Sequence, residues 1–440
     1  MAIAPVRKAA LREFDTMQLK PVLGPVQLFF YSVGVIVGAG IYSVIGAAAG
    51  MAGDGLWLSF LIAAVAALLT GFSYAEMTTA FPAAGAEYVY VQHALPGRQW
   101  VAFGVGFIIL ISGAATATTV AVAFAGYLKT FADVPEVVSA ALLLLACTGL
   151  NILGLRESSW TNIVFTLVEV GGLLLVISIG LRVETFGDAV FATPHAGVLG
   201  GAAIIFFVYL GFEEIANLAE EVRDPARDLP LAIFLSIIVT TVLYVLVALA
   251  VVALARPEEI SASNAPLATA IAKVWPQGTG VLSAIALFAT ANTVLITLIA
   301  TSRLAFSMGR DGGMPAAVAR LLPSRQTPWI AAILVFALSV ALLPIGKLDI
   351  LAGLSSFAAI LAFVAVNVAL IVLRFRLPHH PRPFQVPLAI GRLPVLPLLA
   401  IASLGLLMTQ FERDIYVAGG FALLLTGIVL VIRPFVVKSS

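Results

Sequence analysis

The stretch "VGVIVGAGIYSVIGAAAG", residues 33–50, decides the fold. It is long and apolar enough to belong to a bilayer-crossing helix, yet Gly38, Ala39 and Gly40 stand in its middle. Glycine is a weak helix former, and the bilayer core holds no water that would satisfy the backbone groups released by a break. Such a break is tolerated where it lines a cavity inside the protein. The stretch therefore predicts a broken membrane span beside a binding site.

The composition is that of a membrane protein. Of the 440 residues, 61% are hydrophobic and 11% are charged, and the mean hydropathy is +1.09. Soluble domains carry about 25% charged residues, so a water-facing globule is excluded. The net charge of +1 and the lack of a basic cluster indicate no nucleic-acid partner. The one cysteine, Cys147, excludes an internal disulfide, and its apolar surroundings argue against a disulfide-linked subunit.

Twelve apolar runs meet the length of about 20 residues that crossing about 30 Å of hydrocarbon requires. The predicted spans lie near 25–46, 55–80, 99–128, 136–154, 160–181, 197–217, 229–255, 279–308, 328–345, 348–373, 394–411 and 415–433. The connections between them are short and polar. This pattern predicts an all-α integral membrane protein without a separate soluble domain.

The positive charges predict the orientation, because Lys and Arg gather in cytoplasmic loops. If the N-terminus lies in the cytoplasm, 18 of the 24 Lys and Arg residues fall on the cytoplasmic side of the membrane and 6 fall on the other side. We therefore expect a multi-pass protein of the cell membrane (the plasma or inner membrane) with both termini in the cytoplasm.

A second span shows the same kind of interruption. In "GGAAIIFFVYLGFEEIANLAEE", residues 200–221, the apolar run stops at Leu210 and Gly211, and Glu213 and Glu214 follow at once. The interrupted spans are the first and the sixth, so each begins a set of five. Matching interruptions in two halves point to a midplane binding site in transporters built from inverted repeats. The predicted parts are a cytoplasmic segment at 1–24, a five-helix repeat at 25–181, an inverted five-helix repeat at 197–373, two further helices at 394–433 and a cytoplasmic tail at 434–440.

The backbone groups freed at two such breaks have a defined chemistry. N–H groups at the start of a half-helix favour a carboxylate, through hydrogen bonds and the helix dipole. Carbonyls at the end of the facing half-helix favour an ammonium, so the two together recognise the common part of an α-amino acid. The alternative is that Gly34, Gly38 and Gly46 serve close helix packing. The acids of the sixth span favour a site, because acids within a membrane are costly unless they have a function.

Five motifs carry a family resemblance. They are "VGAGIY" in the first span, "SYAEMTTAFPAAGAEYVYV" in and after the second, "AEEVRDPARDLPLAI" after the sixth, "SRLAFSMGRDGGMPAAVARLLPSRQTPW" after the eighth and "PRPFQVPL" before the eleventh. With these motifs in this order, the chain resembles the amino acid–polyamine–organocation transporter superfamily over nearly its whole length. Within this superfamily, its motifs are most similar to those of the bacterial branch that resembles cationic amino acid transporters. The resemblance implies a LeuT-type 5+5 inverted repeat.

The resemblance also implies which groups hold a substrate. The matched positions are the amides of Ala39, Gly40 and Ile41 for the carboxylate, and the carbonyls of Ile36, Phe207 and Leu210, at the break before Gly211, for the ammonium. The Phe207 ring matches the family's aromatic gate, which closes over the substrate from outside. Its alternative role is that of an ordinary core aromatic.

The membrane-embedded acids are the candidates for coupling. Glu213, just past the second break, is expected to hold a proton or to pair with a basic group of the substrate. Glu169 stands in the fifth span, at a position where the resemblance implies a lysine in many proton-coupled relatives. The acid there is expected either to carry a proton or to bind a cation; its alternative role is that of a buried hydrogen-bonding group. Glu76 of the second span is expected to be structural, joining the inner end of that span to neighbouring loops.

The third and eighth spans are expected to surround the substrate's side chain. Ser112 and Ala115 of the third span and Asn292 of the eighth form the predicted pocket, and the third span contains no acid. A neutral amino acid is therefore the first expectation. A cationic amino acid or a polyamine, served by Glu213, is the alternative.

The predicted function is secondary active transport of an α-amino acid by alternating access, coupled to a proton or a monovalent cation or working by exchange. The alternatives of another class are a membrane sensor and a channel, but no span has a sustained polar stripe and the chain shows no appended domain. An enzyme is not expected, because no catalytic cluster is visible. No cofactor or metal is expected either, since the paired histidines His379 and His380 lack further ligands.

Overall fold

The computed structural model describes residues 23–82, 85–154, 159–191, 197–263 and 265–437. The described chain is almost entirely helical, with one two-stranded antiparallel sheet, β1 (Ala389–Ile390) and β2 (Leu393–Pro394). The long helices are α4 (Leu56–Ala80), α6 (Gln99–Leu128), α7 (Glu136–Leu153), α8 (Ser159–Gly180), α11 (Pro225–Leu254), α14 (Gly278–Arg310), α15 (Trp329–Leu342), α16 (Leu348–Arg376), α17 (Val395–Met408) and α18 (Arg413–Val437). The short ones are α5 (Ala86–Ala94), α9 (Phe186–Phe191), α12 (Pro257–Ser261), α13 (Pro266–Ala272) and the 3₁₀ turns η1 (Gly53–Gly55), η3 (Ala316–Ala319) and η4 (Leu343–Ile345).

The described helices are long and apolar enough for a multi-pass membrane protein. Nine stretches within the described residues meet the length and hydropathy of a membrane span, and the first of them, Pro25–Ala80, contains two of the predicted spans. Two shorter apolar helical stretches, Trp329–Ile345 and Val395–Met408, cover the predicted spans 328–345 and 394–411. The second of these ends before the predicted boundary, because the chain turns at Thr409 and Gln410.

Both helix interruptions predicted from the sequence are present. The first lies between α2 (Pro25–Val37) and α3 (Gly40–Ala52), with Gly38 and Ala39 in the turn. The second follows α10 (Val198–Tyr209), where Leu210 is extended and Gly211 has a φ of +124°. The segment after it, η2 (Phe212–Glu221), is a 3₁₀ helix of 10 residues, although such helices rarely exceed about 4 residues.

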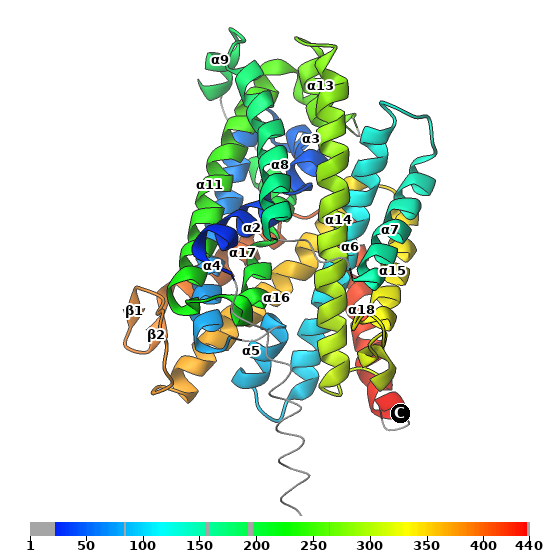
Figure 1. Cartoon of the computed structure of the whole chain (residues 1–440). Helices are drawn as coiled ribbons and strands as arrows, with labels where there is room; N and C mark the ends of the chain where they lie inside the picture. The colour runs from blue at the N-terminus through cyan, green and yellow to red at the C-terminus, as the bar shows by residue number, and fades with distance from the viewer. Residues whose placement is uncertain (1–22, 83–84, 155–158, 192–196, 264, 438–440) are drawn as a thin grey trace, which may run out of the picture.

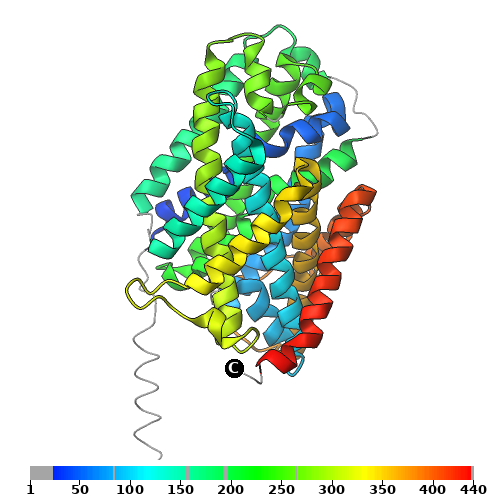
Figure 2. The ribbon, with the colours of Figure 1, turned by 90° about the vertical axis from the view of Figure 1, so that its right-hand side faces the viewer.

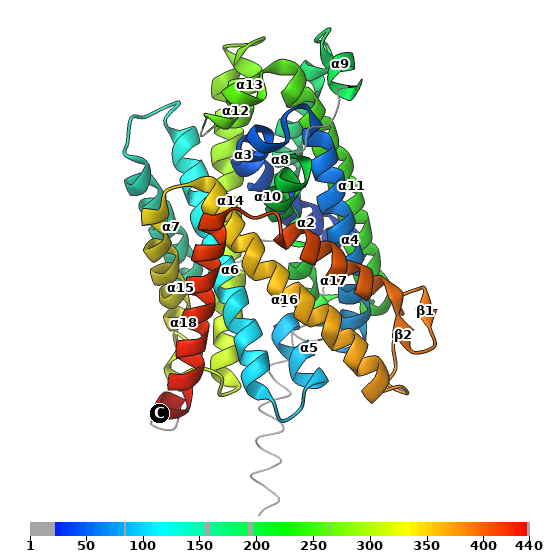
Figure 3. The ribbon, with the colours of Figure 1, turned by 180° about the vertical axis from the view of Figure 1, so that it is seen from behind.

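The broken helices lie inside a shell of unbroken ones. α10 packs against α3, α4 and α16, and α2 packs against α8 and α11. The long helices α6 and α14 run side by side (Figure 1), and α16 crosses α6 obliquely (Figure 3). α18 lies at the edge of the bundle (Figure 2) and exposes Phe421 and Leu424, as expected of a face that meets lipid.

Glu76 has the structural role predicted for it. Its side chain is fully buried near the end of α4, where it pairs with Arg374 of α16 and, at 3.1 Å, with Arg382. It also accepts a hydrogen bond of 2.8 Å from the Val386 amide. Glu76 thus fixes α4 to the end of α16 and to the segment that leads to β1.

Candidate substrate-binding site

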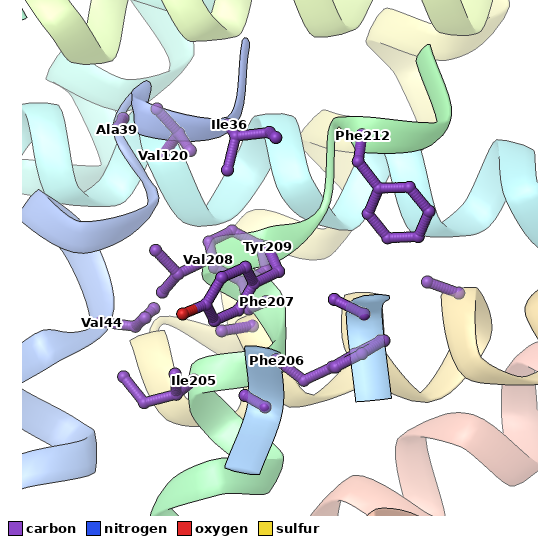
Figure 4. Close-up of a cluster of buried hydrophobic side chains, with 14 of the residues drawn as sticks. Ile36, Ala39, Val44, Val120, Ile205, Phe206, Phe207, Val208, Tyr209 and Phe212 are labelled. Atoms are coloured by element: carbon purple, nitrogen blue, oxygen red, sulfur yellow. The ribbon is translucent and has the colours of Figure 1, made fainter. Parts of the chain in front are cut away.

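The two helix breaks lie against each other. A Cβ on Gly211 would stand 3.1 Å from the Val35 carbonyl oxygen of α2, and a Cβ on Gly40 would stand 3.1 Å from the Val208 Cα of α10. Each break therefore uses a glycine to approach the other broken helix. In Figure 4, Val208 lies beside the turn that carries Ala39.

Some of the backbone groups released at the breaks already have protein partners. The Ala39 amide donates to Thr293 Oγ1 of α14 at 2.9 Å, and the Tyr244 hydroxyl of α11 donates to the Ile36 carbonyl at 2.6 Å. The Phe207 carbonyl accepts from the Leu210 amide at 3.2 Å. The amides in the first turn of a helix have no carbonyl of the same helix as an acceptor. In α3 these amides begin at Gly40.

A cavity lies beside the breaks and reaches towards α5. Its empty volume, which includes the open space at its mouth, is about 860 Å³. Its walls are Gly34 and Val35 of α2, Glu87 of α5, Ile109, Ser112, Gly113 and Thr116 of α6, the break at Leu210 and Gly211, Glu213, Glu214 and Asn217 of η2, and Thr293, Ile296, Thr297, Ala300, Thr301 and Leu304 of α14. On the other side of the breaks, the buried apolar side chains of Val44 and Ile205 lie between α3 and α10 (Figure 4), and the Phe206 ring packs against Phe363 of α16.

Only part of the predicted substrate set lines this cavity. Ser112, Leu210, Gly211 and Glu213 belong to its wall. The residues that lie outside the wall are Ile36, Ala39, Gly40, Ile41, Phe207, Ala115, Asn292 and Glu169. The Phe207 ring is buried at 3% exposure, among the side chains on the far side of the breaks (Figure 4). Its role as a gate stays a prediction.

Helical periodicity explains why Ala115 and Asn292 lie outside the wall. On α6 the cavity-lining residues from Ile109 to Thr116 recur at intervals of three and four, which places them on one face of the helix. Ala115 falls off that face and is fully buried. On α14, Thr293 faces the cavity, so its neighbour Asn292 points about 100° away.

Asn292 instead meets the acid of α8. Its side-chain amide donates to Glu169 Oε1 at 3.1 Å, and the Tyr42 hydroxyl of α3 donates to the Glu169 carbonyl at 2.8 Å. Glu169 is fully buried. The acid predicted to couple transport therefore lies behind the cavity wall, linked to α14 and to the first turn of α3.

Three carboxyl groups line the cavity, and one of them was not expected from the sequence. Glu213 accepts a hydrogen bond of 2.8 Å from the Gly211 amide, and Glu214 accepts one of 3.0 Å from Asn217. Glu87 of α5 is the third. The only sequence signal for Glu87 was its place in the "PAAGAEY" motif, which by itself indicates no contact with the sixth span.

The fold and the cavity define a helical membrane transporter, and comparison with known proteins gives its family. Residues 23–432 match the family model described as amino acid permease, so the chain belongs to this family within the amino acid–polyamine–organocation superfamily. It is 30% identical over 415 residues to the branched-chain amino acid permease BcaP of Bacillus subtilis, with 87% of this chain and 86% of that protein covered. It is 28% identical over 401 residues to the methylthioribose transporter of the same organism, with 86% of each covered. It is 31% identical over 386 residues to the vacuolar cationic amino acid transporter 4 of Arabidopsis thaliana, with 81% of this chain and 64% of the relative covered.

The family fixes the kind of activity. The protein is an amino acid transporter and not an enzyme. The names of the three relatives cover branched-chain amino acids, methylthioribose and cationic amino acids, so likeness to them leaves the side-chain preference open.

Proposed function

We propose that this transporter binds an α-amino acid where the two broken helices meet and moves it by alternating access. The observation that supports the proposal is the mutual approach of Gly211 to α2 and of Gly40 to α10, with a cavity beginning at that contact. The substrate's ammonium would bind carbonyls at the end of α2 and at Leu210. Its carboxylate would bind the amides of Gly40 and Ile41 at the start of α3, and would replace Thr293 as the acceptor for the Ala39 amide, because helix N-termini favour anions.

We further propose a chain of twelve spans, with the LeuT-type 5+5 inverted repeat and both termini in the cytoplasm. In that orientation the cavity is on the cytoplasmic side of the breaks, since it reaches towards α5, at the same end of the molecule as the last turns of α18 (Figure 1). The packed side chains of α3 and α10 then close the route from outside. The amides of Gly40 and Ile41 would become accessible when α2 and η2 move relative to α6 and α14.

Two classes of substrate are candidates, and they differ in the charge of the side chain. The hydroxyl groups of α6 and α14, such as those of Thr116 and Thr297, suit a neutral amino acid. The carboxyl groups of η2 and α5 favour the second candidate, a cationic amino acid or a polyamine. Both candidates require the same backbone recognition at the breaks, except that a polyamine lacks the carboxylate.

Uptake of a radiolabelled amino acid into vesicles that contain the purified protein tests the proposal together with its coupling. The wild type is expected to concentrate the amino acid when a pH gradient is imposed. Glu169→Gln is expected to abolish the pH dependence and to leave equilibrium binding measurable. The glutamine still offers an oxygen to Asn292 but cannot gain or lose a proton, so the variant separates the charge from the hydrogen bond.

Two outcomes would contradict these statements separately. Wild-type vesicles that accumulate none of a full panel of amino acids, under a proton or a sodium gradient, would overturn the proposed transport. A Glu169→Gln variant whose uptake keeps the pH dependence of the wild type would remove Glu169 from the coupling step.

A further inference from the structure

The cavity has two chemically different sides. α6 and α14 contribute hydroxyl groups and apolar side chains, and η2 and α5 contribute the carboxyl groups of Glu213, Glu214 and Glu87. Among the described residues that line the cavity, none is basic. A cation that enters this space therefore meets acid groups without a competing positive charge in the wall.

Glu87 is held in a fixed position by residues of two other elements. The residue is 3% exposed, and its carboxylate accepts a hydrogen bond of 2.8 Å from the Tyr74 hydroxyl of α4. Asn217 of η2 accepts hydrogen bonds from the Gly85 and Ala86 amides at 2.9 and 3.2 Å, which attaches the start of α5 to η2. A binding group that is locked in this way loses little entropy when a ligand binds.

The surroundings of Glu87 disfavour its charge when the cavity is empty. The titratable and charged groups on the elements packed around it include Tyr74 of α4, Glu213 and Glu214 of η2, Tyr90 of α5 itself, and Arg376 of α16, which binds the Ala94 carbonyl at the other end of α5. α6 has no charged residue, and Arg303 of α14 acts on Glu214. Neighbouring buried carboxyl groups do not all ionise unless a cation compensates them.

This setting makes Glu87 a group that exchanges protons near neutral pH. α5 is a nine-residue helix outside the stretches that are long enough to cross a bilayer. Burial raises the pKa of Glu87 from its usual value to about 7, and the charge of Glu214 acts in the same direction.

We propose that Glu87 is a specificity-determining residue of the cavity, whose carboxylate binds the positively charged side-chain group of a cationic amino acid. The cation replaces a proton: the O–H bond of the Glu87 carboxyl group breaks, the proton passes to solvent, and an ion pair forms between the carboxylate and the ammonium or guanidinium group. This inference rests on the proposed substrate site and names the substrate class of that site.

The test is a comparison of lysine and leucine binding to the purified full-length protein by isothermal titration calorimetry at pH 6 and pH 8. Below a pKa of about 7 the cation must displace the proton, and one pH unit corresponds to about a tenfold change in affinity. We therefore expect lysine to bind about tenfold more tightly at pH 8 than at pH 6, with proton release visible as a dependence of the heat on the buffer. Leucine binding should lack this pH dependence.

Two variants of Glu87 and one control variant test whether the carboxylate of Glu87 causes the preference for lysine. At pH 8, Glu87→Gln is expected to lower the ratio of lysine to leucine affinity at least tenfold, whereas Glu87→Asp, which keeps the charge, should retain more of the lysine preference. Glu259→Gln serves as the matched control, because it removes an exposed carboxylate that pairs with Lys273 at 2.9 Å, outside the cavity wall.

The outcomes separate this inference from the proposed function. A wild type that binds leucine but not lysine would overturn the role of Glu87 and leave the site at the breaks standing. An unchanged affinity ratio in Glu87→Gln, or equal ratios in the Gln and Asp variants, would also overturn it. A wild type that binds no α-amino acid would overturn the proposed function itself.

Discussion

Gly211→Ala is expected to lower transport at least tenfold, although it adds a single methyl group. Gly211 has a φ of +124°, a conformation that residues with a Cβ rarely adopt. The added Cβ would lie 2.8 Å from Val35 Cγ1 and 3.1 Å from the Val35 carbonyl oxygen. Backbone strain of this kind costs about 1–3 kcal/mol, and overpacking costs about 1–3 kcal/mol more. Relief of this clash requires α2 and η2 to separate at the place where the substrate is proposed to bind.

The measurement is initial uptake into vesicles, paired with the thermal unfolding midpoint of the purified protein. Gly405→Ala is the matched control, because Gly405 lies within helix α17 and a Cβ there would have no atom within 4 Å. We expect the control to transport like the wild type. Wild-type uptake by Gly211→Ala would show that the contact between the two breaks is not required.

Glu76→Gln is expected to cost about 3–5 kcal/mol of stability, the usual effect of removing one partner from a buried ion pair. The Arg374 and Arg382 side chains are 11% and 5% exposed, and both depend on the Glu76 carboxylate for charge compensation. The glutamine would retain one oxygen for the Val386 amide but would turn N–H groups towards a guanidinium. The end of α16 and the segment before β1 should therefore loosen from α4.

The thermal unfolding midpoint in detergent measures this effect, and hydrogen exchange across residues 377–394 locates it. Glu259→Gln, which breaks an exposed pair, should leave the midpoint unchanged because exposed pairs contribute little. A midpoint for Glu76→Gln equal to that of the wild type would show that the two arginines find other partners.

The helical membrane fold and its two helix breaks were predictable from the sequence because the deciding signals are local. Glycines within apolar runs, followed in the second run by two glutamates, predicted the breaks after Val37 and Tyr209, and both breaks are present. Apolar runs of sufficient length located the helices. The 3₁₀ geometry of η2 carried no comparable signal, since its acids and apolar residues fit an α-helix equally well.

The candidate site was predictable only in part, because it depends on how distant helices are rotated and packed. A single helical step separates Thr293, which faces the cavity, from Asn292, which bonds to Glu169. The Ile36 carbonyl appeared available for a ligand, yet Tyr244 reaches it from 208 residues further along the chain. Glu87 enters the cavity because Asn217 attaches α5 to η2, a tertiary contact without a periodic pattern.

The expectation of a neutral substrate illustrates the same limit. It relied on the absence of an acid from the third span, and α6 does present an uncharged face to the cavity. The carboxyl group of Glu87, which we propose to bind a cation, comes from α5, just before that span. A pocket assembled from several elements cannot be assigned from the residues of one of them.

The central claim is that peptide groups at two helix breaks hold the ammonium and the carboxylate of one small molecule. Its most direct test takes the amino acid that stabilises the purified protein most strongly and measures its dissociation constant by titration calorimetry. The same measurement follows for its decarboxylated amine and its deaminated acid. Hydrogen bonds to charged groups contribute about 1.5–3 kcal/mol each, so each analogue is expected to bind at least about tenfold more weakly than the amino acid. An analogue that binds as tightly as the amino acid itself would contradict recognition at the breaks.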